Sequence, residues 1–198
     1  MPRISLREQH ADATRERILG AVTDLLEHGA AAELTVPAVA EASGVSLRTI
    51  YRYYPTREEL LEAAGRWIGD ELLEHPYPRS LDEVADLYEA GARDFDERPG
   101  LVRALAFSEL GRHVRGYRRR ERLETLRRAL RTELPALSDA ELRRAEGVLA
   151  YLHNMLAYTT LREENGLSGP EIGEAIGWAI RTLVADLKEQ DRNARRGK

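Results

Sequence analysis

Residues 35–61 decide the fold of this chain and read TVPAVAEASGVSLRTIYRYYPTREELL. Thr35 is a good N-cap for a first short helix, and Ser46 can cap a second one that ends before Pro55. Between them, Gly44 supplies the positive φ that a sharp chain reversal requires. The stretch therefore predicts two short helices joined by a tight turn, a spacing typical of helix-turn-helix proteins.

The charge of this stretch favours contact with nucleic acid. Residues 43–57 contain Arg48, Arg52 and Arg57 but no Asp or Glu. A helix-turn-helix places its second helix in the DNA major groove, so Leu47 and Arg48 are expected to face base edges. Arginine reads guanine bidentately, whereas leucine can only contact a thymine methyl group or a sugar. The side chains suited to phosphate contacts are Thr35, Ser46, Thr49, Tyr51, Tyr53 and Arg57.

Each of these residues has an ordinary structural explanation when it is considered alone. An exposed arginine is usually a solvated surface residue, and Tyr51 or Tyr53 would more often be a half-buried core aromatic. Together, in a window without acidic residues behind a glycine turn, they predict a duplex DNA interface.

The same residues resemble a known family. Residues 14–61, and chiefly 44–61, closely resemble the DNA-binding domain of the tetracycline-repressor (TetR) family. The resemblance implies a homodimeric, ligand-responsive transcriptional regulator, usually a repressor that binds an inverted-repeat operator and is released by a small-molecule inducer. It also implies backbone-contacting and base-reading roles for the residues named above. Two positions depart from the family pattern: Arg57 replaces a common Lys, and Tyr54 replaces a common Phe.

Composition sets further bounds on the chain. It has 198 residues, no cysteine and a net charge of −4, so any DNA-binding charge must be confined to one face. The absence of cysteine excludes disulfides and thiolate metal sites. The sequence shows neither a signal peptide nor an apolar run of transmembrane length, which predicts a cytoplasmic protein without membrane contact. No cofactor and no metal are expected.

Apolar residues recur at helical spacing along the whole chain, which predicts an all-α fold. We expect a helix-turn-helix domain with an N-terminal arm over residues 1–57 and a helical ligand-binding and dimerisation domain over 58–198. The expected helices cover 14–28, 35–43, 46–53, 56 onward, 81–97, 99–111, 117–133, 138–164 and 170–190. The tail from Arg192 is expected to be disordered. The two longest helices are the expected dimer interface, unless they are interior helices of a monomer.

An inducer pocket is expected among the C-terminal helices, where aromatic side chains and a few polar groups suit a drug-sized molecule. Asn154 beside His153 is the most suggestive pair, because buried polar groups require partners. Ordinary core packing is the alternative for each candidate. The candidates are Trp67, Tyr88, Phe95, Phe107, His113, Tyr151, His153, Asn154, Tyr158 and Trp178.

One stretch of the sequence is much more basic than the rest. Residues 112–131 hold nine arginines and two glutamates, a local charge of +7. A solvated helix face is one interpretation. An anionic inducer such as an acyl-coenzyme A, or contact with a partner, are the others.

An enzyme is the rival class of function. The sequence contains no His-Glu-x-x-His motif, phosphate-binding loop or G-x-S-x-G elbow. His113 and His153 could meet in a metal site. The sequence therefore predicts a regulator that is not an enzyme, and it leaves repressor, activator and regulation without a small inducer open.

Overall fold

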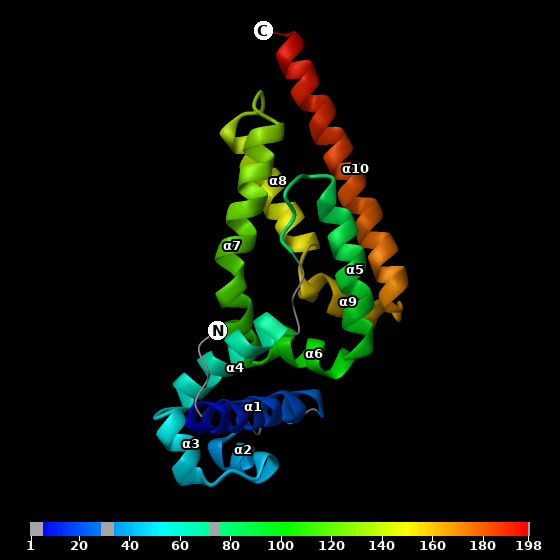
Figure 1. The fold of residues 1–198 in the computed structure, drawn as a ribbon. Helices are drawn as coiled ribbons and strands as arrows, with labels where there is room; N and C mark the ends of the chain where they lie inside the picture. Colours follow the sequence, from blue (N-terminus) through cyan, green and yellow to red (C-terminus); the bar gives the residue numbers. More distant parts are fainter. Residues whose placement is uncertain (1–5, 29–33, 72–75, 198) are drawn as a thin grey trace. The chain divides into compact units, whose positions relative to one another are not determined.

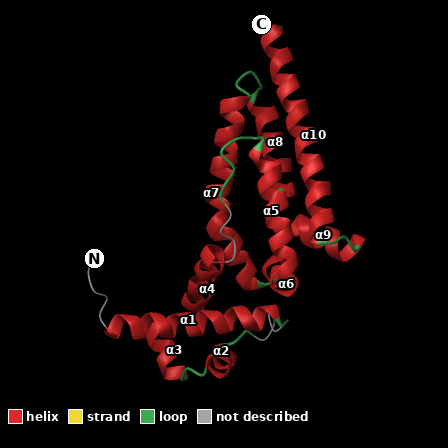
Figure 2. Cartoon of the chain, turned by 45° about the vertical axis from the view of Figure 1, so that its right-hand side comes forward, coloured by secondary structure: helices red, strands yellow, loops and turns green. Residues whose placement is uncertain are grey.

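The fold was analysed in a computed structural model that describes residues 6–28, 34–71 and 76–197. All the regular secondary structure in these residues is helical, which confirms the all-α prediction (Figures 1 and 2). No helix in this part of the chain is long and apolar enough to cross a membrane. The helices are α1 (Leu6–Glu27), α2 (Val36–Ser43), α3 (Leu47–Tyr53), α4 (Arg57–Glu71), α5 (Glu83–Glu97), α6 (Pro99–Phe107), α7 (Glu109–Glu133), α8 (Asp139–Leu152), α9 (Met155–Asn165) and α10 (Gly169–Arg196).

The helices form two compact units, each with its own core. The first unit comprises Met1–Leu73 and Pro99–Tyr117, and the second comprises Glu74–Arg98 and Arg118–Lys198. Helix α7 therefore begins in the first unit and continues into the second. The expected functional boundary at residues 57/58 lies inside the first unit and stays a prediction.

In the first unit, helix α1 packs against α2, α4 and α6. Its buried face includes Ile18, Val22 and Leu26, as the apolar spacing predicts. The helix begins at Leu6, so the expected start near residue 14 is wrong. Thr14 does not cap it, because the Thr14 hydroxyl lies within the helix and donates to the carbonyl of His10 at 2.7 Å.

The joint between α6 and α7 lies at Ser108, and the expected break at Gly116 is wrong. The Ser108 hydroxyl accepts a hydrogen bond from the Gly111 N–H at 3.0 Å, which supports the first turn of α7. At Gly111 a Cβ atom would overlap the carbonyl oxygen of Leu105, so only glycine permits this close approach of the two helices. Gly116 stays helical because one glycine inside a long helix costs only ~1 kcal/mol.

In the second unit, α5 lies beside the N-terminal part of α10, and α10 extends beyond it toward the C-terminus (Figures 1 and 2). Gly169 and Gly173 are one turn apart on α10, and their Cβ positions would lie 2.6 Å from the Ala92 carbonyl oxygen and 3.4 Å from the Glu89 Cα. Small residues therefore let the two helices approach closely. The face of α10 that packs inside the unit is apolar, with Ile172, Ile176 and Ile180 buried.

The expected single helix over residues 138–164 is wrong, because the chain breaks after Leu152. Asn154 adopts an extended conformation, and its side-chain oxygen accepts a hydrogen bond from the Leu156 N–H at 3.1 Å. It is thus the N-cap of α9. Asparagine competes with the helical backbone for hydrogen bonds, which explains the interruption of an otherwise helical pattern.

The expected disorder from Arg192 is also wrong, because α10 continues to Arg196; Lys198 lies outside the described residues. Asp191 anchors this end. Its side chain is 3 % exposed, accepts a hydrogen bond from the Ala136 N–H at 2.7 Å and pairs with Arg195 at 2.6 Å. A buried carboxylate with two partners holds the last turns of α10 against the segment between α7 and α8.

We expect Asp191→Ala to lower the free energy of unfolding by about 1–3 kcal/mol, because it leaves the Ala136 N–H without its acceptor. Chemical denaturation followed by circular dichroism measures the change. Glu189→Ala, at an exposed carboxylate on the same helix, is the matched control and should alter stability by less than about 0.5 kcal/mol. Equal effects of the two substitutions would contradict the anchoring role.

Candidate nucleic-acid interface

Helices α2 and α3 are joined by the turn that the sequence predicts. The hydroxyl of Thr35 accepts a hydrogen bond from the Ala38 N–H, and that of Ser46 accepts from the Thr49 N–H at 3.2 Å. Gly44 ends α2 with a φ of 63°, in the left-handed region. The two predicted caps and the predicted glycine turn are therefore confirmed.

Helix α3 is held in place from one side only. Ile50 is fully buried, and Val45 and Tyr54 are buried at its two ends. The guanidinium of Arg17, on α1, donates to the carbonyl oxygen of Ser43 at 2.7 Å, which fixes the end of α2 next to the turn. The sequence analysis did not single out Arg17, because its partner is 26 residues away.

The opposite side of α3 faces solvent. Leu47 and Tyr51 are 42 % and 48 % exposed, and Arg48 and Arg52 are exposed beside them. Residues at i, i+1, i+4 and i+5 share one helical face, so these four side chains are available together. A large apolar side chain beside an arginine near a helix N-terminus matches the chemistry of thymine methyl and guanine edges.

The hydroxyls of Ser46 and Thr49 bond to each other at 2.9 Å. Ser46 is also the helix cap, so its position is fixed before any ligand binds. Thr35, at the N-terminus of α2, is likewise both exposed and a cap. Three of the residues predicted to contact phosphate therefore also have a structural role in the free protein.

Tyr53 lies between two arginines. The guanidinium carbons of Arg15, on α1, and Arg52, on α3, are each 5.3 Å from the centre of its ring. Cation–π contacts of this kind orient the ring and place positive charge on either side of it. Arg15, which also pairs with Asp12 at 2.7 Å, adds a basic group that sequence reasoning missed.

Arg57 forms an ion pair with Glu109. Both of its terminal nitrogens donate to one carboxylate oxygen of Glu109, each at 3.1 Å. The pair joins the first residue of α4 to the first residue of α7, both in the first unit. Helix α4 itself begins as predicted, with the Thr56 hydroxyl accepting from the Glu59 N–H at 3.1 Å.

This geometry defines a class of protein: a helical DNA-binding protein of the helix-turn-helix type. Residues 18–64 match the family model of the bacterial regulatory proteins of the tetR family. The match shows a DNA-binding domain of the tetR type over these residues. The resemblance found in the sequence is thereby confirmed.

Two solved structures share the fold along most of the chain. One is a transcriptional regulator from Rhodococcus sp. Rha1, 20% identical, with a TM-score of 0.61 over 87% of this chain and 96% of that one. The other is a TetR transcriptional regulator from Rhodococcus sp. RHA1, 18% identical, with a TM-score of 0.53 over 89% and 98%. No curated protein matches the chain in sequence.

The candidates for an inducer pocket are divided between the two units, and within the second unit Tyr88 contacts His153 and Phe95 contacts Tyr158. Phe107 and His113 belong to the first unit and are exposed. Tyr151 and Trp178 belong to the second unit and are 58 % and 68 % exposed. No group of three metal-ligating side chains occurs among the described residues. The pocket stays a prediction.

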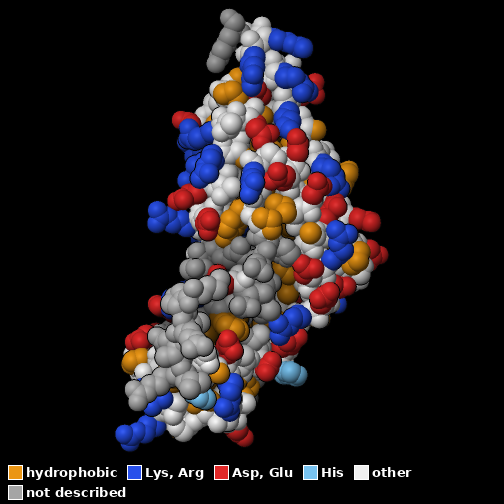
Figure 3. Space-filling view, in the orientation of Figure 1, with side chains coloured by type: hydrophobic (Ala, Val, Ile, Leu, Met, Phe, Trp, Pro, Cys, Tyr) orange, Lys and Arg blue, Asp and Glu red, His pale blue; other side chains and the backbone are white. Residues whose placement is uncertain are grey.

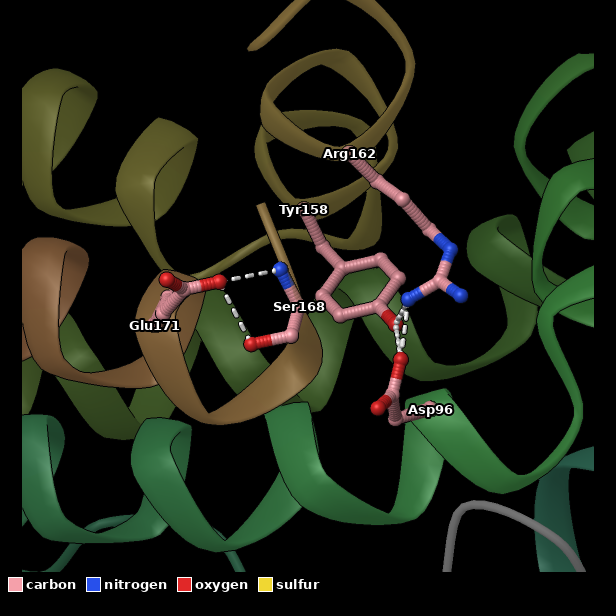
Figure 4. Close-up of polar contacts among 5 residues, drawn as sticks. All are labelled: Asp96, Tyr158, Arg162, Ser168 and Glu171. Atoms are coloured by element: carbon pink, nitrogen blue, oxygen red, sulfur yellow. Dashed lines mark hydrogen bonds and ion pairs between the residues drawn. The ribbon is translucent and has the colours of Figure 1, made fainter. Parts of the chain in front are cut away.

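Tyr158 is buried and takes part in a polar cluster of the second unit (Figure 4). Its hydroxyl donates to Asp96 at 3.2 Å, and Arg162 bonds both Asp96 and the Tyr158 hydroxyl. Burial raises the pKa of Tyr158, and the nearby guanidinium of Arg162 opposes that shift. The cluster connects α5 to α9 with its polar groups satisfied.

The same view shows the capping box of α10. The backbone N–H and the hydroxyl of Ser168 both donate to the carboxylate of Glu171, at 2.8 Å and 2.6 Å. These bonds lower the pKa of Glu171, because they stabilise its charged form. They fix the start of the helix that runs through the second unit.

The hydroxyl of Tyr88, unlike that of Tyr158, is not part of a polar cluster in the described part of the chain. Tyr88 is buried, and its ring meets the His153 ring edge-on at a centroid distance of 5.8 Å, but its hydroxyl makes no hydrogen bond within the described residues. Burial raises the pKa of Tyr88, so the hydroxyl remains protonated. A buried hydroxyl without a partner is costly, and it marks a place where a ligand or water can supply one.

We expect Arg48→Ala to weaken binding to a specific site by about 1–3 kcal/mol and to relax the preference at one base pair in each half-site. Tyr51→Phe should weaken binding to all sequences about equally, because it removes a predicted phosphate contact. Competition titrations with single-base variants of a bound duplex measure both effects. A loss at one base position for Tyr51→Phe, or uniform loss for Arg48→Ala, would contradict these roles.

We expect Glu109→Gln to strengthen DNA binding up to about fivefold, because an exposed ion pair of this kind restrains Arg57 by up to ~1 kcal/mol. Fluorescence anisotropy with a labelled duplex measures the dissociation constant. The effect should vanish in an Arg57→Gln background if it acts through Arg57.

Glu58→Gln is the matched control for this experiment, since Glu58 is an exposed carboxylate adjacent to Arg57 on α4. It removes the same charge without releasing Arg57. An equal gain in affinity from Glu58→Gln would mean that general charge repulsion, and not the Arg57–Glu109 pair, controls binding.

Proposed function

We propose that the protein is a homodimeric repressor that binds an inverted-repeat operator and is released by a small-molecule inducer. The observation that carries the proposal is the exposed face of α3, where Leu47, Arg48 and Tyr51 project from a helix that is capped and packed on its other side. Such a helix reads only a few base pairs. Two copies related by a two-fold axis supply the specificity that one copy lacks.

Exposed apolar side chains on α8 and α10 support dimer formation. Val148 and Tyr151 lie one turn apart on α8, and Trp178 on α10 is the most exposed of the large hydrophobic side chains described. The two helices contact each other within the second unit. Large exposed aromatics on adjacent helices are typical of a protein–protein interface.

Charge on the same helices favours self-association. Exposed Arg144 lies on α8, whereas exposed Glu171 and Glu174 lie at the start of α10. In a two-fold interface the same surface occurs on both copies, so α8 of one copy can meet α10 of the other. Basic and acidic side chains then face each other twice.

We expect Trp178→Glu and Tyr151→Glu each to raise the dimer dissociation constant by about 10- to 100-fold, because each places a charge among apolar groups. Analytical ultracentrifugation over a concentration series measures it. Arg93→Glu, at an exposed site on α5, is the control and should leave dimer formation unchanged. A monomeric wild-type protein would contradict the proposed dimer.

The second unit also supports regulation by a ligand. The buried hydroxyl of Tyr88 makes no hydrogen bond within the described residues, and the Tyr88 ring meets the His153 ring edge-on. An inducer acts only if it binds one arrangement of the helices better than another. In this mechanism, the preferred arrangement places the two recognition helices off the half-site spacing.

Activation of transcription, or regulation without a small inducer, is the second candidate function. The same DNA interface would serve either. In all cases the protein would act in the bacterial cytoplasm, where its DNA target lies.

Selection of bound sequences from a random duplex pool, with purified full-length protein at defined salt, tests the proposal. Recovery of an inverted repeat supports a dimeric, sequence-specific regulator and supplies the duplex for an inducer screen. Recovery of single half-sites would contradict dimeric binding. Recovery of no motif from a folded dimer would contradict the role of α3.

A further inference from the structure

A groove runs between α7 and α8 on the surface of the second unit. Its volume is about 670 Å³, and α7 contributes to it at residues 119, 123, 127, 130 and 131. These positions form one stripe along the helix, about 18 Å long at 1.5 Å per residue. The facing wall comes from α8, from Asp139 to Ala150.

The side chains that line this groove carry more positive than negative charge. Arg127 pairs with Glu146 at 2.6 Å, and Arg131 pairs with Asp139 at 3.2 Å, so both acidic residues of the lining are already occupied. Arg119 and Arg143 are exposed and have no ion-pair partner within the described part of the chain. Figure 3 shows basic side chains gathered along the edge formed by α7. The groove is therefore a local basic surface on a protein of net charge −4.

The floor of the groove is apolar. Leu130 and Leu142 are buried, and Leu123 and Ala150 are half-buried. A Cβ atom at Gly147 would meet nothing within 4 Å, so packing inside the protein does not require glycine there. The groove thus offers apolar contacts at its base and open space beside the α8 backbone.

These features favour one class of negatively charged ligand over the others. A small molecule requires a site that covers most of its surface, but exposed Gly147 and Arg143 leave this groove open along its length. Duplex DNA would pair with the arginines but would leave the leucines against charged phosphates. An amphipathic helix with acidic flanks fits both, because its apolar face covers the half-buried Leu123 and Ala150 and its carboxylates meet Arg119 and Arg143.

The geometry points to this groove as a docking site for an acidic amphipathic helix of a partner protein. The site is separate from the DNA interface, which belongs to the first unit, and does not depend on the proposed repressor function. It gives the arginine-rich stretch of α7 a role in recruitment of a protein partner.

The probe is a fluorescein-labelled peptide of about 18 residues, or about 27 Å as a helix, with leucines on one face and glutamates flanking them. Its binding to the full-length protein is followed by fluorescence polarisation. One control peptide has lysine in place of every glutamate, and another has the same composition in scrambled order. We expect saturable binding of the acidic helix alone, weakened by added salt.

Variants then locate the site. The double variant Arg119→Glu and Arg143→Glu should weaken binding of the acidic peptide about tenfold or more. Gly147→Ile should also weaken it, because the side chain fills the groove without a clash inside the protein. Arg93→Glu, which makes one Arg-to-Glu change on α5, should leave binding unchanged, and each single variant of the pair should weaken binding more than Arg93→Glu does.

Other results would overturn the inference. Equal binding of the lysine or scrambled peptide would mean that the groove does not recognise an acidic amphipathic helix. Loss of random-sequence duplex binding in the double variant, without loss of peptide binding, would assign the arginines to nucleic acid. A change in dimer dissociation for the double variant or for Gly147→Ile would assign the groove to contact between copies of this chain.

Discussion

Helix α3 is seven residues long, and a helix of that length is not stable in water by itself. The whole DNA interface therefore depends on contacts outside the helix. The buried Ile50 side chain attaches α3 to the core, and the Ser46 hydroxyl accepts a hydrogen bond from the Thr49 N–H in its first turn. Because one side of α3 packs against the core, the opposite side presents Leu47, Arg48 and Tyr51 to solvent.

Local features of this interface could be predicted from the sequence, because they depend on residues only a few positions apart. Thr35 and Ser46 each cap the N–H of the residue three positions later, and Gly44 adopts the positive φ that favours glycine. All three therefore have the conformation that their residue type predicts. The exposure of Arg48 follows from the burial of Ile50 two residues later on the same short helix.

Features that depend on distant partners could not be predicted in this way. The Arg57–Glu109 pair spans 52 residues, and Arg15 reaches Tyr53 from another helix. The break at Asn154 differs from these, because its cap is local: Asn154 bonds the Leu156 N–H, and the apolar stripe that continues at helical spacing on both sides hid the break. The persistence of α10 beyond Arg192 depends on a hydrogen bond between Asp191 and Ala136, 55 residues apart.

Methylation interference on a duplex obtained by selection tests the DNA interface most directly. Guanine N7 lies in the major groove and adenine N3 in the minor groove, so the two modifications report different binding modes. If α3 lies in the major groove as we propose, methylation at guanine N7 will block binding at two positions related by the two-fold axis of the site. Interference from adenine N3 alone, with none from guanine N7, would contradict it.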